Sequence, residues 1–545
     1  MRNAERKGPV AAPMPGLDSL VSRKRLRAPS EHGDAWIDPP LAEVLQRWPV
    51  SDAQPARQKV AILGSPLGDL AERAREELRQ RALAHSTVYL PEAAAPPQPR
   101  IVMAGHQPRL FHPGVWFKNF LLSRVAAAHH ALPVNLVIDN DVADTVAIRV
   151  PTGSPEQPRM ESVLFDQATA IMPFEERTIL DRETFERFGI EVAARIAPFV
   201  DDPIVNRLWP LAVEAAKRGS SLGQAIASAR HQLEWQLGVR NLEVPLSSIC
   251  DSHPFRVFML HILGNLERFR EIHNRSLHVY RRLHKIRSRS HPVPELASES
   301  GWLEAPFWVW DTRNPTRRQL FARVLERGIE LTDRRDWTAR IATTDDFAEI
   351  RAGGVKLRSR ALTTTMYARL LLCDLFVHGI GGAKYDQLTD AIVSEFFGCA
   401  APGYLTVSAT AKILPDKSAQ IHEKLRQTID TQRSLEFHPE KHVNWSALEH
   451  DKAARVRELV REKARVLEAE PSNGKAKSRH DAIVAINREL QSCLKQTQQI
   501  LEERQRQLAI EFRRQSQLAS RDFSFCLFSF QSLPALLLEL LEKDA

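Results

Sequence analysis

The sequence predicts an α/β protein: a Rossmann-like parallel sheet with helical insertions and a C-terminal antiparallel coiled-coil hairpin. Two short apolar runs at 101–104 and 134–138 flank an apolar helical stretch at 115–131, as in a βαβ unit. Residues 175–290 show mostly helical periodicity, and apolar residues in the last third recur at heptad spacing. A chain of 545 residues also exceeds the length that one hydrophobic core supports, so we expect more than one structural unit.

The composition excludes several other classes of protein. Hydrophobic residues make up 43% and charged residues 26% of the chain, which is ordinary globular usage and argues against wholesale disorder. The five cysteines include no C-x-x-C pair, which argues against a structural zinc module or a disulfide framework and favours a reducing, cytoplasmic location. No run of 18 apolar residues occurs, so we expect no membrane-spanning segment.

The chain divides into four predicted parts. Residues 1–60 hold eight prolines without a sustained period, which predicts a largely disordered leader. The Rossmann-like core is expected over 61–440, with a helical insertion around 175–300. A coiled-coil hairpin over 441–520 and a C-terminal segment over 521–545, which docks back on the core, complete the prediction.

The βαβ unit predicts a ligand site. Its first strand leads into residues 105–108 (GHQP), and its second strand leads into residues 139–141 (DND). A right-handed crossover between parallel strands brings both loops to the same carboxyl edge of the sheet, where open α/β sheets bind their ligands. We therefore expect the two loops to face one cleft.

A glycine-rich turn supplies a third candidate loop. Residues 379–384 (GIGGAK) follow an apolar run at 370–377 and precede a helix-like stretch at 385–397 and a strand at 404–408. Such a turn before a helix lets backbone N–H groups approach an anion, although tight packing is the commoner reason for one. We predict that this turn lines the same cleft as the other two loops.

Basic residues are concentrated between 273 and 290. This stretch contains no acidic residue and six basic ones, against a net charge of +8 for the whole chain: Arg275, Arg281, Arg282, Lys285, Arg287 and Arg289. Apolar residues at 272, 279, 283 and 286 place the basic side chains on the opposite face of one helix. The pattern fits a solvated helix face or a site for a phosphate or carboxylate. Nucleic acid is not the expected partner, because the rest of the chain is nearly neutral.

The last third predicts two helices joined by a turn at 471–474 (PSNG). The seam residues step by three and four positions, as in coiled coils: Val456, Val460, Lys463 and Leu467, then Ile483, Ile486, Leu490, Cys493, Thr497 and Ile500. We expect an antiparallel hairpin near 449–518 that offers a surface for homo-oligomerisation. Two shorter segments, 307–310 (FWVW) and 523–528 (FSFCLF), are interpreted as a core strand and as a strand that docks on the main body.

These motifs together resemble a known family. The order of GHQP at 105–108, Gly114, Lys118, DND at 139–141 and the glycine pair at 381–382, followed by a coiled-coil hairpin, resembles the bacillithiol biosynthesis cysteine-adding enzyme family. Members of that family look like class I nucleotidyltransferases and aminoacyl-tRNA synthetases in their core. The resemblance implies a class I nucleotidyltransferase-like fold and a ligase that joins cysteine to an amino-sugar malate conjugate.

The family's motifs carry over onto named positions of this chain. Its glycine–glutamine–glutamine–proline signature falls on 105–108, with His106 in place of the first glutamine. Its acidic strand-end motif falls on 139–141, with Asn140 in place of a histidine. The glycine pair and the glutamine after it fall on Gly381, Gly382 and Gln387.

Charge predicts a division of labour at this site. We assign catalytic roles to His106, which donates to an oxyanion or a phosphate, and to Asp139 and Asp141, which orient an amine or hold a divalent ion. Lysines neutralise a carboxylate or phosphate. The predicted substrate-binding residues are Gly105, Gln107, Gly114, Lys118, Asn140, Gly381, Gly382, Lys384 and Gln387. No metal-ligand set is predicted.

Three of these residues also have a structural interpretation. A strand-end Asp139 caps a turn, His106 is a hydrogen-bonded loop residue, and Lys118 extends to solvent from an apolar helix. These alternatives stay open at the level of sequence.

Three classes of function follow from the sequence. The first is a cytoplasmic ligase that acts on a small polar amino-sugar-type substrate, with ATP or another nucleotide as the candidate activator. The second is a binding or scaffold protein of the same fold, whose site has changed at His106 and Asn140. The third, with the least support, is a synthetase-like nucleic-acid binder that uses the basic helix.

Overall fold

The structure is a computed structural model, and it describes residues 26–48, 60–95, 100–155, 157–288, 290–414, 418–446, 448, 450–468 and 476–543. The chain forms two compact units: Met1–Ala411 with Arg521–Ala545 (unit 1), and Lys412–Ser520 (unit 2). None of the described helices has the length and apolarity needed to span a bilayer.

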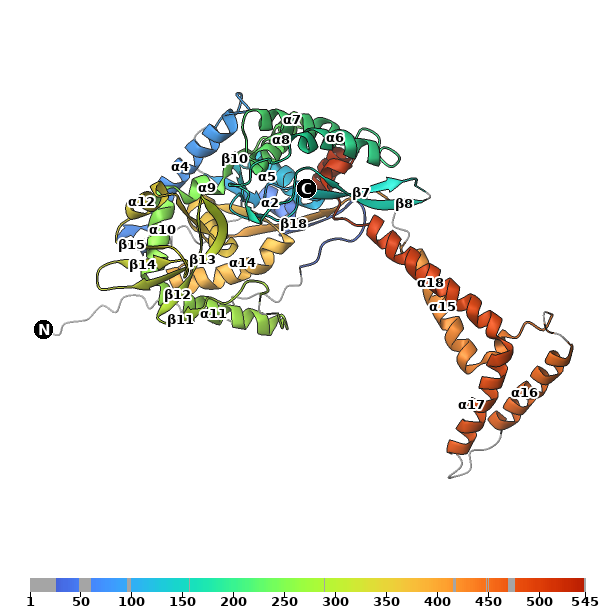
Figure 1. Ribbon diagram of the computed structural model, residues 1–545. Coiled ribbons are helices and arrows are strands. Elements are labelled where there is room, and N and C mark those ends of the chain that lie inside the picture. The colour runs from blue at the N-terminus through green and yellow to red at the C-terminus, as the bar shows by residue number, and fades with distance from the viewer. Residues whose placement is uncertain are drawn as a thin grey trace. The chain divides into compact units, whose positions relative to one another are not determined.

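A six-stranded sheet lies at the centre of unit 1 (Figure 1). The strand order is β1-β18-β17-β4-β5-β10, and all neighbours are parallel except β1 and β18. The strands are β1 (Asp34–Asp38), β4 (Ile101–His106), β5 (Leu132–Val137), β10 (Leu242–Pro245), β17 (Leu375–Gly379) and β18 (Tyr404–Thr410). The prediction of an α/β fold whose first two core strands share a parallel sheet is confirmed.

Helices cover both faces of this sheet. Alternate β4 residues Ile101 and Met103 belong to the same core as α4 (Leu67–Thr87), so Val102 and Ala104 face the other side. The crossover helix α5 (Pro113–Ala128) joins β4 to β5, and α14 (Ile380–Ile392) joins β17 to β18. The glycine pair at 381–382 therefore lies in the first turn of α14, which begins earlier than the predicted residue 385.

The predicted leader is partly ordered. Residues 1–25 and 49–59 lie outside the described residues, but β1 and α2 (Leu41–Gln46) form between them. Strand β1 adds an antiparallel edge strand to β18, with Trp36 opposite Ser408. The leader was predicted to be largely disordered, but Ile37, Leu41 and Val44 bury apolar side chains despite the proline-rich composition.

The helical insertion is present, and it also supplies a strand of the central sheet. Its helices are α6 (Arg182–Ile196), α7 (Val205–Lys217), α8 (Leu222–Gln236), α9 (Leu246–Cys250), α10 (His253–Gly264) and α11 (Leu266–Leu283). Strand β10 lies between α8 and α9 and pairs with β5. The basic run follows helix α11 and extends beyond its end at Leu283.

A second, antiparallel sheet follows α11. Its strands are β11 (Ser298–Glu299), β12 (Trp302–Asp311), β13 (Asn314–Val324), β14 (Ile329–Thr332), β15 (Thr338–Ile341) and β16 (Val355–Ser359). Strand β12 lies between β13 and β16. The predicted core strand at 307–310 is confirmed, and the rest of this sheet was not predicted.

The remaining elements of unit 1 are shorter or lie at its surface. The small strand pairs are β2 (Ala61–Ile62) with β3 (Ser65–Pro66), β6 (Val142–Ala143) with β9 (Met172–Pro173), and β7 (Ala147–Gly153) with β8 (Pro158–Leu164). The remaining helices are α12 (Asp346–Ala352), α13 (Ala361–Tyr367) and α19 (Ser532–Lys543), with π-helical turns at Ala368–Leu372 and Val393–Phe397.

The described part of unit 2 contains four helices, whereas the prediction was a single two-helix hairpin. Its helices are α15 (Ser418–Phe437), α16 (His450–Glu468), α17 (Ala476–Cys493) and α18 (Lys495–Leu518), with a 3-10 turn at Pro439–His442. Helices α16 and α17 run antiparallel, because Arg455 bonds to Glu489 and Arg479 bonds to the Val466 carbonyl. Figure 1 shows α15 along α18, and the His422 and Phe512 rings are in contact.

This arrangement corrects the predicted hairpin in two respects. The unit begins at Lys412 rather than at 441, because α15 packs along α18. The second predicted helix is divided near Leu494 into α17 and α18. The predicted seam residues beyond Leu494 therefore lie on α18, where Ile500 is 61% exposed. The predicted turn at 471–474 lies outside the described residues, whereas Val456, Leu459, Ile486 and Leu490 do form a core.

The chain returns to unit 1 at Arg521. The predicted strand at 523–528 is wrong: the segment contains a 3-10 turn at Phe525–Leu527. Its alternating pattern arises from docking, since the Phe525 ring packs on Trp116 at 4.6 Å and its N–H donates to the Phe111 carbonyl.

Candidate functional site

A cavity of about 820 Å³ lies at the carboxyl ends of the parallel strands of unit 1. Residues from the ends of β4, β5, β17 and β18 line it. The antiparallel sheet contributes Trp308, Arg317 and Ser359 on another side, and the C-terminal segment contributes Arg521 and Asp522. This position is the one at which open α/β sheets bind ligands.

The structure brings most of the predicted site residues to this cavity. Those that line it are Gly105, His106, Gln107, Gly114, Lys118, Asn140, Asp141, Gly381 and Gly382. Asp139, Lys384 and Gln387 lie outside its lining. Gln387 is buried on another side of α14, and Lys384 is half-buried two residues after the glycine pair.

Lys118 is the central cation of the cavity. It is 3% exposed, and its ammonium group donates to the Gly105 carbonyl at 2.7 Å. Burial, assisted by the charge of Arg230, lowers the pKa of Lys118 to about 7. The charge of Lys118 therefore changes near neutral pH. The structural interpretation, in which this side chain extends to solvent, is wrong because the side chain is buried.

His106 lies next to this lysine. Burial and the charge of Lys118 hold the pKa of His106 well below its usual value, so the imidazole is neutral at pH 7. Its Nδ1 lies 3.2 Å from the Gln107 carbonyl, which can only accept, so Nδ1 carries the proton. Nε2 is then the acceptor of this ring.

Asp141 is held from two sides. Gln107 Nε2 donates to its Oδ2 at 2.8 Å, and Arg317 Nη1 donates to its Oδ1 at 2.9 Å. Burial raises the pKa of Asp141, but the hydrogen bond from Gln107 and the charge of Arg317 outweigh it and lower the pKa overall. Asp141 is thus an ionised carboxylate on the cavity wall at neutral pH.

The two preceding residues are engaged in the scaffold. Asp139 accepts from the Ser247 backbone N–H at 2.9 Å and from its hydroxyl at 2.5 Å, so it caps the start of α9. Burial and the charge of Glu175 raise the pKa of Asp139 to about 7. Asn140 donates to the Ser359 carbonyl at 2.8 Å and so joins β5 to the antiparallel sheet. The structural interpretation of Asp139 fits these contacts.

The antiparallel sheet supplies a cationic wall that the sequence did not predict. The guanidinium groups of Arg317 and Arg360 lie 4.4 and 4.2 Å from the ring centroid of Trp308. All three residues line the cavity. Arg360 also donates to Glu304 at 2.7 Å. Trp308 and Arg317 lie on the neighbouring strands β12 and β13, and Arg360 directly follows β16.

The start of α5 is fixed against β18. His112 Nδ1 accepts from the Gly114 N–H and caps the helix. A Cβ at residue 114 would overlap the Ala409 carbonyl and lie 2.6 Å from the Arg521 guanidinium, so only glycine fits. Arg521 in turn donates to the Ser408 hydroxyl at 2.9 Å. Steric exclusion of any side chain therefore explains why residue 114 is glycine.

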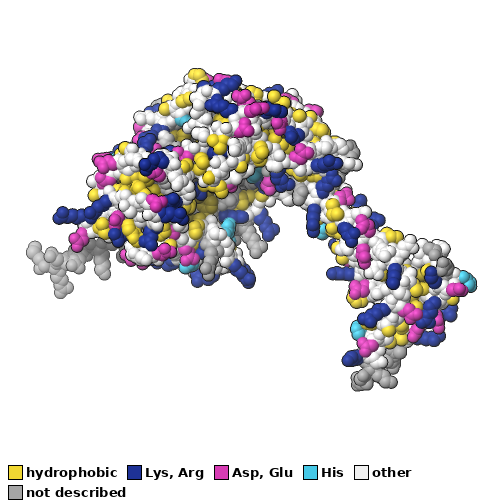
Figure 2. Space-filling view, viewed as in Figure 1, with side chains coloured by type: hydrophobic (Ala, Val, Ile, Leu, Met, Phe, Trp, Pro, Cys, Tyr) yellow, Lys and Arg dark blue, Asp and Glu magenta, His cyan; other side chains and the backbone are white. Residues whose placement is uncertain are grey.

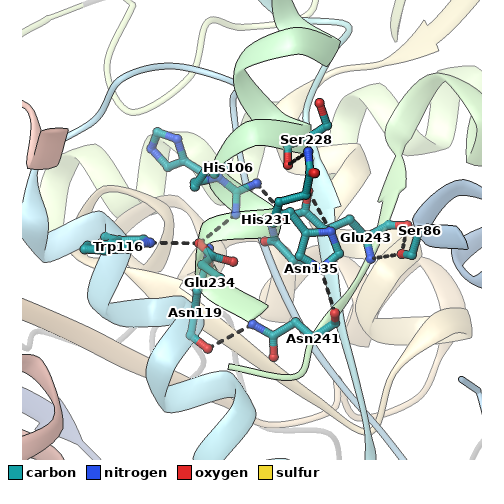
Figure 3. A network of polar contacts seen from close by, with 12 residues as sticks. Ser86, His106, Trp116, Asn119, Asn135, Ser228, His231, Glu234, Asn241 and Glu243 are labelled. Atoms are coloured by element: carbon teal, nitrogen blue, oxygen red, sulfur yellow. Dashed lines mark hydrogen bonds and ion pairs between the residues drawn. The ribbon is translucent and has the colours of Figure 1, made fainter. Parts of the chain in front are cut away.

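A buried polar network lies beside His106 (Figure 3). Arg230 donates to Glu234 at 2.8 Å and to Glu243 at 2.5 Å, and Trp116 and Asn119 also donate to Glu234. Burial opposes the charge on Arg230, but the two carboxylates raise the pKa of Arg230 overall. The network joins α5, α8 and β10, so it holds the helical insertion against the sheet that carries the site.

Two arginines of the basic run, Arg275 and Arg281, are paired with acidic residues. Arg275 forms an ion pair with Glu395, and Arg281 and His278 lie 2.8 and 3.1 Å from Glu295. On the face shown in Figure 2, basic and acidic side chains are interspersed. The described part of this helix thus resembles a solvated, ion-paired face more than a polyanion track.

Comparisons with known proteins add no relative. No protein-family model and no curated protein sequence matches the chain. Within the described ranges, no group of three or more His, Cys, Asp or Glu side chains is arranged to hold a metal ion.

Proposed function

We propose that the protein is a ligase that forms a C–N bond between cysteine, or a related amino acid, and the amine of a small polar amino-sugar-type substrate in low-molecular-weight thiol biosynthesis. The observation that carries the proposal is that the three motif loops at 105–108, 139–141 and 379–384, which are up to about 280 residues apart, line one cavity. These loops follow the neighbouring parallel strands β4, β5 and β17, which bring them to one edge of the sheet.

The charges of the cavity suit such a substrate. Lys118, Arg317 and Arg360 provide cations for carboxylate or phosphate groups, and arginine offers a planar pair of donors to either. The ionised Asp141 provides an anion that orients an amine. A molecule that carries both an amine and an anionic group fits this distribution of charge.

The proposal includes two finer expectations. The core is expected to be of the class I nucleotidyltransferase-like type, and the carboxyl group is expected to be activated by ATP or another nucleoside triphosphate. We place the reaction in the cytoplasm, in keeping with the five cysteines, all of which are free thiols.

Two measurements test this proposal. Low-molecular-weight thiols are compared in the host with and without the gene, and the purified protein is incubated with cysteine, ATP and candidate amino-sugar conjugates. We expect one thiol conjugate to disappear from the host and to form in vitro, with loss of the product in Arg317→Ala. An unchanged thiol pool together with no product would contradict the ligase function.

One observation favours a second candidate, a binding protein without turnover. Asp139 and Asn140 both use their side chains in hydrogen bonds with the scaffold, and Asp139 lies outside the cavity lining. Saturable binding of the amine substrate to the purified protein, with no product in the presence of nucleotide, would favour this candidate.

A further inference from the structure

A short segment between α11 and β11 forms an apolar wall of the cavity. We call residues 291–296 (HPVPEL) the wall segment. Its lining residues are Pro292, Val293, Pro294 and Leu296. The cations Lys118 and Arg317 lie on other elements that line the same cavity. One bound molecule can therefore meet cations at one end and an apolar surface at the other.

Arg281 holds the wall segment from α11. Its Nε donates to the His291 carbonyl at 3.2 Å, and its Nη2 donates to the Val293 carbonyl at 2.9 Å. Its Nη1 donates to Glu295 Oε1 at 2.8 Å. One guanidinium group thus fixes three residues of the segment. Arg281 is not part of the cavity lining, so it acts on the cavity through the wall segment.

Asn274 holds the far end of the wall segment and orients a histidine. Its Nδ2 donates to the Leu296 carbonyl at 3.0 Å, and its Oδ1 accepts from the Leu296 N–H at 2.9 Å. This pair of bonds fixes the orientation of the Asn274 amide. His273 Nδ1 lies 3.1 Å from the same Oδ1, which can only accept, so Nδ1 carries the proton. Nε2 is then the acceptor of the His273 ring.

His273 places this acceptor in the cavity lining beside the wall segment. The side chain is 4% exposed and lines the cavity. Burial lowers the pKa of His273 to about 4, so the ring is neutral at pH 7. Nε2 makes no hydrogen bond with any residue that the structure describes, and it is not closed off from a small molecule. An apolar wall with one such acceptor suits a flat ring that carries an N–H donor.

We infer that the wall segment and His273 form the subsite for the base of the activating nucleotide, and that this base is adenine. The inference rests on the proposed ligase function. Cysteine and the amino-sugar conjugate are polar, whereas the nucleotide carries a large uncharged ring that gains from an apolar wall. The exocyclic amino group of adenine donates to Nε2 of His273. Guanine and uracil have at that position a carbonyl, which can only accept.

Calorimetric titration of the full chain tests the subsite without turnover, because cysteine and the amine are left out. Three ligands are compared: ATP, purine riboside triphosphate, which lacks the exocyclic amino group, and inorganic triphosphate, which lacks the base and sugar. We expect the wild type to bind ATP about 10-fold more tightly than the riboside analogue. Inorganic triphosphate should bind more weakly than either.

Three variants separate the acceptor from the wall. His273→Phe should bind ATP no more tightly than the riboside analogue and should keep its affinity for inorganic triphosphate. Arg281→Met should speed amide hydrogen exchange over 291–296 and weaken ATP binding about 10-fold, with triphosphate binding within about 3-fold of wild type. Arg275→Met is the matched control on α11, because Arg275 pairs with Glu395 rather than with the wall segment. It should keep wild-type values.

The outcomes distinguish this inference from the proposed function. A wild type that does not bind ATP, or that binds ATP and the riboside analogue equally, would overturn the adenine subsite. Unchanged exchange over 291–296 in Arg281→Met would overturn the role of Arg281. The expected affinities without any ligase product would contradict the ligase and support the subsite. Product formed only with a different nucleotide would support the ligase and overturn the subsite.

Discussion

Lys118 places an ammonium group in a buried position, where it donates to a neutral carbonyl oxygen. Because the pKa of Lys118 is lowered to about 7 from 10.5, the unfolded chain binds more protons than the folded one between these pH values. Stability should therefore rise with pH over this range. Anion binding should show the opposite trend, since the cation is present only below about pH 7.

The variant Lys118→Met tests this assignment. It should unfold at a higher urea concentration than wild type near pH 7, with a weaker dependence of the free energy of unfolding on pH between 7 and 10. It should also bind anionic ligands more weakly at pH 6. Urea titrations at several pH values measure the first effect and calorimetry the second. Parallel pH profiles of the two proteins would contradict the lowered pKa.

Gly382 and Gly381 form a matched pair of test positions. Gly382→Ala should destabilise unit 1 by about 1–3 kcal/mol, because the new methyl group overlaps His378. Gly381→Ala meets open space in a helix and should be neutral or stabilising by up to about 1 kcal/mol. Thermal melts of both variants measure the difference. Equal melting temperatures would show that the ring moves aside without cost.

At this scale the sequence identified the loops better than the side chains that work in them. The acidic motif at the end of a strand predicted Asp141, and the family resemblance predicted Lys118. His378 was not predicted as a cavity residue, because its hydrogen-bond partner Asp386 lies two turns into a helix and carries no motif. Arg317 and Arg360 were missed because their place depends on the pairing of distant strands.

At the scale of elements, two acidic residues that follow β5 have different roles: Asp139 is structural and Asp141 is functional. Asp139→Ala should lower stability by about 1–3 kcal/mol, since it leaves the Ser247 N–H at the start of α9 without its acceptor. Asp141→Asn should shift the melting temperature by at most about 4 °C while abolishing ligand binding or turnover. Differential scanning calorimetry combined with a binding assay distinguishes the two roles. Retained binding with a large loss of stability in Asp141→Asn would make this residue structural as well.

Helices and strands were predictable where the hydrophobic pattern extended over enough consecutive residues to show its period. The βαβ unit follows from two apolar runs around an apolar helix, and its strands pair as expected. Strand β10 was hidden because four residues between helices carry too little periodicity to identify a strand. Helix α15 was assigned to the core because its own sequence does not show that α18 is its partner.

At the scale of the whole molecule, unit 2 is inserted between two segments of the cavity wall. Unit 1 leaves at Ala411 after β18 and resumes at Arg521, which donates to the Ser408 hydroxyl and the Ala409 carbonyl of that same strand. The two chain ends are thus held together within unit 1. A short linker should therefore replace residues 412–520 without strain.

Such a deletion variant should unfold in one cooperative transition and keep its affinity for cavity ligands. Circular dichroism melts and calorimetry measure both properties. Sedimentation of the full chain and the deletion variant tests the predicted homo-oligomerisation, because only the full chain should associate if unit 2 joins copies. A deletion variant that fails to fold would show that unit 1 depends on unit 2.

The close approach of α5 and β18 at Gly114 limits how this chain can diverge. A side chain at this position would have to displace backbone, which no change of a neighbouring side chain can offset. In a saturation library selected for folding, residue 114 should therefore accept glycine alone, whereas most exposed positions of α5 should vary freely. Distant relatives that keep this architecture are then best sought by a glycine at the first turn of the first crossover helix, even where the acidic and glycine-pair motifs have been replaced.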